Sequence, residues 1–305
     1  MYLCRLRVQK VNLKEYVAMK ADEYHNNAGL SASIAKVLLA KSLYHAWMES
    51  ALNPNRVRTD SAIMDIGTAC HAMLLEGRDV VEVCDFLDWR TSASKEARDS
   101  ARERGKIPLL TEKYSEVLEM YEKAQGESLL AGFKLSEGKS EQSFFWNSGG
   151  TAMRARLDWL ANDRSLIIDY KTTGLDSPAA WMRSITSNGM DLQPAHYIDA
   201  VEQGGEGTPA FIWMVQETES PYMVYFVEPS AGMLEIGRQK MAIARKRWQA
   251  CLDNNFWPGY SQEVMIAEPP AWAFAEIEEK LITQETWSEL AFRFGKVAPK
   301  QRHGK

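Results

Sequence analysis

Apolar residues recur at helical spacing over much of the chain. In residues 31–51 they fall at Ile34, Val37 and Leu38, directly after serines that can cap a helix N-terminus. The same periodicity, with a serine and a proline opening one segment and a glycine following another, predicts further helices. These are expected over residues 63–75, 111–126, 177–185, 193–203, 233–254 and 275–290.

Three short runs in the middle of the chain have a different pattern. Residues 141–147, 151–160 and 165–171 are rich in β-branched and aromatic side chains, and Asn, Gly and Asp separate them. This arrangement favours an antiparallel meander. Two further strands are expected over residues 209–217 and 221–228. Helices and strands together predict an α/β fold.

The composition is that of an ordinary globular protein, with 305 residues of which 45% are hydrophobic and 25% charged. No repeat or linker interrupts it, so one domain is expected over residues 1–305, ending in a mobile basic tail at 291–305. No stretch approaches the roughly 18 apolar residues of a membrane span, and the charged N-terminus does not resemble a signal peptide. We therefore expect a cytoplasmic protein without a membrane partner.

The cysteines form no C-x-x-C pair, which argues against a zinc ribbon, an iron–sulfur cluster and a disulfide framework. Reduced thiols are expected at Cys4, Cys70, Cys84 and Cys251.

The net charge of −5 has the wrong sign for binding nucleic acid through the overall charge of the protein. A nucleic-acid role would therefore require a local basic patch. Residues 90–106 contain six basic and three acidic side chains and are one candidate. The alternative is a solvated helix face, because runs of mixed charge usually have that structure.

Asp169 and Lys171 end the apolar run RSLIIDYKTT at alternate positions. Side chains alternate along a strand, so these two project from the same face while Tyr170 points away from it. Asp158 lies in the preceding predicted strand, and in a hairpin it can converge with Asp169. Two carboxylates and a carbonyl suit Mg²⁺ or Mn²⁺, and a lysine can orient a water for phosphodiester hydrolysis. The alternative is a surface ion pair.

Further motifs accompany this triplet in a consistent order. They are LSAS at 30–33, GTACH at 67–71, EQSFFW at 141–146, RLDWL at 156–160, QPAHY at 193–197 and WPGY at 257–260. With Asp158 and the Asp169–Lys171 triplet, the chain resembles the PD-(D/E)XK nucleases over about residues 28–275. Within them it is similar to the exodeoxyribonuclease VIII (RecE-like) and lambda-exonuclease branch of phage and prophage recombination systems.

The resemblance implies roles for the strand residues. Asp158 and Asp169 would bind the metal ion together with the backbone carbonyl of Tyr170, and Lys171 would polarise the attacking water or hold a phosphate. Glu141 would bring a third carboxylate or a second metal ion.

It also implies roles for three helical residues and one arginine. His71 would contact the metal ion or a phosphate, although a lone helical histidine is more often a core residue. Gln193 and Tyr197 would bind the scissile strand or orient the site. Either Arg154 or Arg156 would neutralise a phosphate or pair with Glu141.

The resemblance implies a restriction-endonuclease-like α/β core, a central mixed sheet flanked by helices. The implied activity is Mg²⁺-dependent (Mn²⁺ is possible) degradation of one strand of linear double-stranded DNA from its ends, 5′ to 3′. The 3′ overhang would pass to a RecT-like single-strand annealing protein, and the exonuclease would form a homo-oligomeric ring. The alternatives are a nuclease for single-stranded DNA, flap DNA or RNA, and a catalytically silent DNA-binding subunit.

Overall fold

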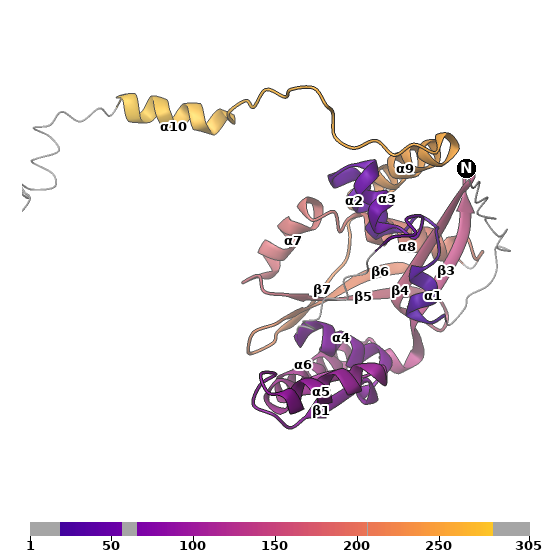
Figure 1. Cartoon of the computed structure of the whole chain (residues 1–305), viewed down its shortest axis with the longest axis vertical. Coiled ribbons are helices and arrows are strands. Elements are labelled where there is room, and N and C mark those ends of the chain that lie inside the picture. The colour runs from indigo at the N-terminus through magenta and orange to yellow at the C-terminus, as the bar shows by residue number, and fades with distance from the viewer. Residues whose placement is uncertain (1–18, 57–65, 206, 283–305) are drawn as a thin grey trace, which may run out of the picture. The chain divides into compact units, whose positions relative to one another are not determined.

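A computed structural model describes residues 19–56, 66–205 and 207–282 (Figure 1). The chain divides into two units, Met1–Gly259 and Tyr260–Lys305. The described part of the second unit contains one helix, α10 (Ala271–Ile282). A single domain over the whole chain stays a prediction, and the predicted tail at 291–305 lies outside the described residues.

A five-stranded sheet forms the centre of the first unit, in the order β3-β4-β5-β6-β7. The pairs β3–β4 and β4–β5 are antiparallel, as the predicted meander requires. The pair β6–β7 is also antiparallel, whereas β5 and β6 are parallel. Two helices connect β5 to β6, because a parallel pair needs a long crossover. The strands are β3 (Gly138–Ser148), β4 (Thr151–Ala161), β5 (Leu166–Thr173), β6 (Ala210–Glu217) and β7 (Val224–Val227).

Helices cover the two faces of this sheet and create two hydrophobic cores (Figure 1). The first core packs the sheet against α2 (Ala32–Ala40), α3 (Leu43–Glu49), α7 (Pro178–Ser187), α8 (Leu192–Glu202) and α9 (Ala231–Asn254). The second core packs it against α4 (Ile66–Glu76) and α6 (Thr111–Leu130). This mixed sheet flanked by helices confirms the predicted fold class.

A second, two-stranded sheet lies beside α6. Its parallel strands β1 (Val81–Cys84) and β2 (Ile107–Leu110) are joined through α5 (Ser92–Glu103). Each strand has only four residues, the shortest run in which an alternating pattern can be read, and the sequence did not predict them. The remaining short elements are α1 (Ala21–His25) and the 3₁₀ turns η1 (Arg78–Val80) and η2 (Leu135–Glu137).

The helix predicted over residues 31–51 is in fact two helices. Ser42 interrupts it, because its side chain accepts a hydrogen bond from the His45 N–H and so caps a new helix, α3. By contrast, Ser177 caps α7 as predicted, with proline in the first turn. The predicted helix starts at 63–65 and helix end at 283–290 fall outside the described residues.

Cys70, Cys84 and Cys251 are free and buried, in agreement with the expected reduced thiols, and Cys4 lies outside the described residues. Among the described helices, none has the length and apolar character needed to span a bilayer.

Candidate active site

Strands β4 and β5 separate at the two predicted carboxylates. They pair only at Trp159–Ile168 and Leu160–Ile167, so Asp158 and Asp169 stand opposite each other where the ladder stops. We call this point the fork. Beyond the last paired residues, the Tyr170 N–H of β5 donates a hydrogen bond to the Asp158 side chain and not to a backbone carbonyl of β4. The acceptor is Oδ2, at 3.1 Å. The predicted convergence of the two strands on one point is therefore present.

The neighbouring strand is irregular at the same level. Glu141 lies opposite Asp158, between the pairs Ser140–Trp159 and Gln142–Leu157, and its φ of 55° is in the left-handed region. On β4, Leu157 packs in the first core and Trp159 in the second, so the regular alternation of faces breaks at Asp158. Left-handed backbone at a residue other than glycine is strained and is concentrated at functional sites.

Asp169 is fully buried and has two partners. Its Oδ2 lies 2.5 Å from Lys171 Nζ, and its Oδ1 accepts a hydrogen bond from Gln193 Nε2 at 2.7 Å. Gln193 also donates to the Tyr197 hydroxyl at 2.9 Å, so α8 reaches the fork through two predicted residues. Asp169 and Lys171 share a face, as predicted.

Burial and neighbouring charges set the protonation of these groups. Burial raises the pKa of Asp169 to about 7, although Lys171 opposes the rise. Burial alone would lower the pKa of Lys171, but the charges of Asp169 and Asp158 raise it overall. For Asp158, burial is outweighed by Lys171 and by the His71 hydrogen bond, so its pKa lies below the usual value. Asp158 is therefore the carboxylate that stays ionised at neutral pH.

His71 reaches the fork from the opposite layer. Its Nε2 lies 3.2 Å from Asp158 Oδ2, and its ring centroid lies 5.9 Å from that of Tyr170. Burial by itself would lower the pKa of His71, but the hydrogen bond and charge of Asp158, with the charge of Glu141, raise it above the usual value. His71 is thus a polar partner of Asp158 and not a core histidine.

Three of the predicted ligands form a group that fits a metal ion. Ligand atoms of His71, Glu141 and Asp158 all lie within 4.8 Å of one another. This oxygen-rich set with one nitrogen suits Mg²⁺ or Mn²⁺. Asp169 stands across the fork from Asp158 and is not part of the group, so its role as a metal ligand stays a prediction. The role of the Tyr170 carbonyl as a ligand stays a prediction.

The two candidate arginines have different positions. The Arg156 guanidinium donates to the Glu141 carboxylate, one of the two predicted alternatives. Arg154 is buried, and its guanidinium donates to the Tyr24 carbonyl. Arg154 therefore binds a backbone carbonyl and not the Glu141 carboxylate.

Comparison with known proteins assigns the chain to a family. Residues 23–268 match the model of a PDDEXK-like domain of unknown function (DUF3799). The chain belongs to this PDDEXK-like family. Membership places it in the PD-(D/E)XK superfamily and supports a nuclease activity. No curated protein matches the chain.

A solved structure shares the fold of this PDDEXK-like chain. The crystal structure of a "Putative exonuclease" from Eubacterium rectale has a TM-score of 0.58 and 12% sequence identity, and the match covers 85% of this chain and 98% of that one. At this identity the likeness shows the fold alone. The crystal structure of SSO0001 reaches a TM-score of only 0.25 at 15% identity, covering 49% of this chain and 69% of that one.

The sequence did not point to two residues that lie near the predicted site residues. Glu76 ends α4, and both burial and the charge of Glu141 raise its pKa. Tyr24 places its ring beside the guanidinium groups of Arg154 and Arg156, at 4.8 and 5.9 Å. Glu76 is acidic and shares a helix with His71, which is a weak signal, whereas nothing in the sequence connects Tyr24 with the site.

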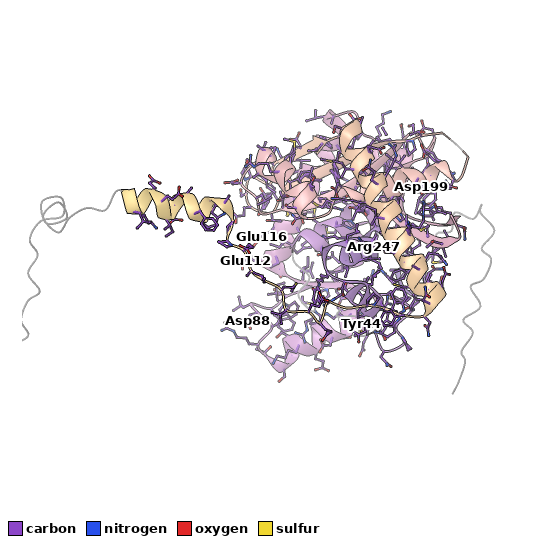
Figure 2. All side chains as sticks on the ribbon, turned by 90° about the horizontal axis from the view of Figure 1, so that it is seen from above. Tyr44, Asp88, Glu112, Glu116, Asp199 and Arg247 are labelled. Carbon is purple, nitrogen blue, oxygen red and sulfur yellow. The ribbon has the colours of Figure 1, made fainter. Side chains whose placement is uncertain are left out.

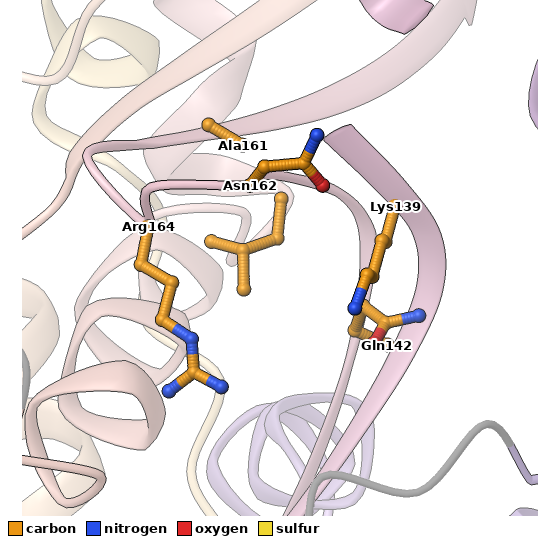
Figure 3. Close-up of a pocket in the computed structure, with 6 residues that line it drawn as sticks. Lys139, Gln142, Ala161, Asn162 and Arg164 are labelled. Atoms are coloured by element: carbon orange, nitrogen blue, oxygen red, sulfur yellow. The ribbon is translucent and has the colours of Figure 1, made fainter. Parts of the chain in front are cut away.

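A small pocket lies at the turn end of the β4–β5 hairpin (Figure 3). It encloses about 90 Å³ and contains none of the predicted site residues. Its lining residues are Lys139, Gln142, Leu160, Ala161, Asn162 and Arg164. The pocket is therefore separate from the predicted site residues at the fork.

Gly67 lets α4 approach β5 closely enough for His71 to reach Asp158. A Cβ atom at Gly67 would lie 2.4 Å from the Thr172 hydroxyl oxygen. We expect Gly67→Ala to lower the free energy of unfolding by about 1–3 kcal/mol, measured by urea denaturation, because the contact is overpacked. Gly126→Ala is the control: nothing lies within 4 Å of that position in α6, so the alanine should raise stability. Equal behaviour of the two variants would contradict the proposed close approach.

Proposed function

We propose that this protein is a metal-dependent exodeoxyribonuclease that degrades one strand of linear duplex DNA, 5′ to 3′, and leaves a 3′ single-stranded overhang. The observation that carries the nuclease proposal is the fork, where Asp158, Asp169, Lys171 and His71 meet. The finer proposal is supported by the motif resemblance to phage recombination exonucleases.

The chain's own residues have distinct tasks in this proposal. Asp158, Asp169, Glu141 and His71 would hold a divalent cation, which when bound supplies Lewis-acid stabilisation of charge on the phosphate. Lys171 is held beside Asp169 at 2.5 Å and stays cationic, so it can orient a water and offset negative charge on the reacting phosphate. Gln193 and Tyr197 fix the Asp169 carboxylate from the side of α8.

The basic stretch at residues 90–106 is a weak candidate for the DNA-binding surface. Arg98 lies 2.8 Å from Asp99, Arg104 lies 2.5 Å from Glu82, and Lys106 lies 4.0 Å from Asp79. Nearby carboxylates therefore neutralise much of its charge, which agrees with a solvated helix face.

Helix α9 carries basic residues that lack such partners. Arg238, Lys246 and Arg247 are exposed and form no ion pair within the described parts of the chain; Arg247 is labelled in Figure 2. The acidic residues of α9 are engaged elsewhere, because Gln239 donates to Glu235 and Gln249 donates to Asp253, both at 2.8 Å. In a protein of net charge −5, α9 is the better candidate for phosphate contacts.

We expect the salt dependence of DNA binding to distinguish these two helices. In a Lys171→Ala background, changing Arg238, Lys246 and Arg247 to glutamine should reduce the slope of log K against log salt by up to about 3, since each lost phosphate contact contributes about 0.9. Fluorescence anisotropy with a short duplex measures this slope. The matched triple change of Arg98, Arg104 and Lys106 should leave it unchanged, and the opposite result would place the DNA at α5.

An assay on end-labelled DNA tests the proposed activity. Linear duplex with 5′-phosphates, closed circular duplex and single strands are incubated with Mg²⁺ or with EDTA. We expect degradation of the linear duplex from its 5′ ends, intact circles, and no reaction in EDTA. Equal cutting of circles would overturn the exonuclease proposal, and a preference for single strands or flaps would select the alternative substrate.

The alternative of a silent DNA-binding subunit is less well supported. Such relatives lose a ligand or the lysine, and this chain retains Asp158, Asp169 and Lys171 in contact with partners at the fork. A ring-shaped homo-oligomer and a single-strand annealing partner are further proposals, which rest on the motif resemblance alone.

A further inference from the structure

A cluster of buried polar side chains lies behind the fork, among the residues that α4 and α6 cover. Gln216 of β6 is completely buried, and its amide nitrogen donates to the Met120 carbonyl at 3.0 Å and to the Tyr222 carbonyl at 3.2 Å. Both amide hydrogens thus have acceptors. Since a reversed amide would set its oxygen against two carbonyls, Oε1 must point away from them.

The Gln216 Oε1 atom faces the phenol of Tyr170. The Tyr170 hydroxyl donates to it at 2.5 Å and lies 3.3 Å from Cys70 Sγ, which itself lies 3.8 Å from Oε1. A phenol has one hydrogen, and the shorter distance assigns it to Gln216. Tyr170, Gln216 and Cys70 are at most 2% exposed, so water does not compete for these contacts.

The cluster includes residues of β5, which bears Asp169 and Lys171, and of α4, which bears His71. Tyr170 lies between Asp169 and Lys171, and its N–H binds Asp158 on one side while its phenol is anchored on the other. Cys70 directly precedes His71 on α4. A single buried group therefore connects the strand that bears Asp169 with the helix that bears His71.

We propose that the Tyr170 phenol, anchored by Gln216 and in contact with Cys70, is a positioning group that sets the spacing of β5 and α4 and thereby the geometry of the metal site. This inference rests on the proposed metal-dependent function. In this proposal the side chains of the cluster do not touch the reacting atoms, because the phenol acts through the backbone of β5 and through α4.

The physical reason lies in the spacing between β5 and α4. Strand β5 is held in the sheet by its full pairing with β6, but that pairing does not fix the distance to α4, which packing and side-chain contacts such as that of Tyr170 with Cys70 must set. An aliphatic residue in place of Tyr170 could shift at little cost. A buried phenol cannot, because a shift leaves its hydroxyl or the Gln216 oxygen without a partner.

Calorimetry of Mn²⁺ binding to the full chain tests the proposal without DNA. We expect Tyr170→Phe to weaken Mn²⁺ binding about tenfold, the lower end of the effect of groups that orient metal ligands. Gln216→Met removes the acceptor of the Tyr170 hydrogen bond and should weaken Mn²⁺ binding to a similar extent. The Mn²⁺ affinity of the double variant should not be lower than that of whichever single variant binds Mn²⁺ less tightly. The reason is that both changes remove the same hydrogen bond between Tyr170 and Gln216.

Tyr121→Phe is the matched control. Tyr121 lies in the same core, and its hydroxyl accepts a hydrogen bond from Gln125 of the same helix at 2.6 Å. It should keep wild-type Mn²⁺ affinity. Wild-type affinity in Tyr170→Phe and Gln216→Met, or an equal loss in Tyr121→Phe, overturns the positioning role while leaving the proposed function intact. Absence of Mn²⁺ binding by the wild-type protein overturns both.

Discussion

Lys171→Ala is expected to lower the rate of DNA hydrolysis by at least about 100- to 1000-fold, because it removes a preorganised positive charge beside the reacting phosphate. Lys171 stays cationic despite its burial, and no other lysine in the described structure contacts Asp169. The measurement is the initial rate of acid-soluble nucleotide release from linear duplex in Mg²⁺. DNA binding should survive the change, so the loss should fall on the rate at saturating DNA.

The chain contains a matched control for this change. Lys240 lies 2.5 Å from the buried Asp191, and the exposed fractions of the two side chains are 30% and 0%. The corresponding values for Lys171 and Asp169 are 2.5 Å, 27% and 0%. Lys240→Ala should therefore cause a similar loss of thermal stability without the loss of activity. A Lys171→Ala enzyme as fast as the wild type would disprove the assignment of the site.

Asp158→Asn should abolish metal binding and lower the hydrolysis rate by at least about 100-fold. The amide oxygen of asparagine can still accept the Tyr170 N–H, so the fork should keep its shape, but a formal negative charge is lost where a cation binds. Calorimetry with Mn²⁺ and rate measurements in Mg²⁺ provide the two readouts.

The same variant should change the titration of His71. In the wild type, the hydrogen bond and charge of Asp158 raise the pKa of His71 against the effect of burial. Without that charge, burial prevails, so the pKa should fall and the imidazole should lose its proton at lower pH; NMR titration measures this. Asp199→Asn is the control, since Asp199 of α8 accepts a hydrogen bond from Trp146 of β3 and is not one of the predicted site residues. An unchanged His71 pKa in Asp158→Asn would contradict the contact.

The spacing of apolar residues was sufficient to predict the main helices and strands. The alternation of side chains along a strand was sufficient to predict that Asp169 and Lys171 project from the same face. Alternation along β5 is local, so it could be derived from residues 165–171 alone. The prediction that Asp158 and Asp169 lie close together followed from placing their two strands in one short hairpin. The motif resemblance brought in His71, Gln193 and Tyr197, which helical spacing alone could not connect with the strands.

Other features depend on contacts between distant segments and have no local signal. The left-handed backbone of Glu141 occurs within a run that reads as a regular strand. The contact of Tyr24 with Arg154 joins residues on separate elements, and the acceptors of Gln216 lie on α6 and on the β6–β7 loop. The capping by Ser42 depends only on nearby residues. It was not predicted because the helical spacing of apolar residues continues on both sides of Ser42.

The early end of the β4–β5 ladder also has a mechanical consequence. Eight register positions join β5 to β6, so β5 is the rigid arm of the fork, whereas β4 shares only two positions with β5. The distance between Asp158 and Asp169 can then change without breaking any main-chain hydrogen bond between their strands. Cations of different radius, or a phosphate arriving between the arms, can be accommodated by bending β3 and β4 together while β5 keeps its place in the sheet.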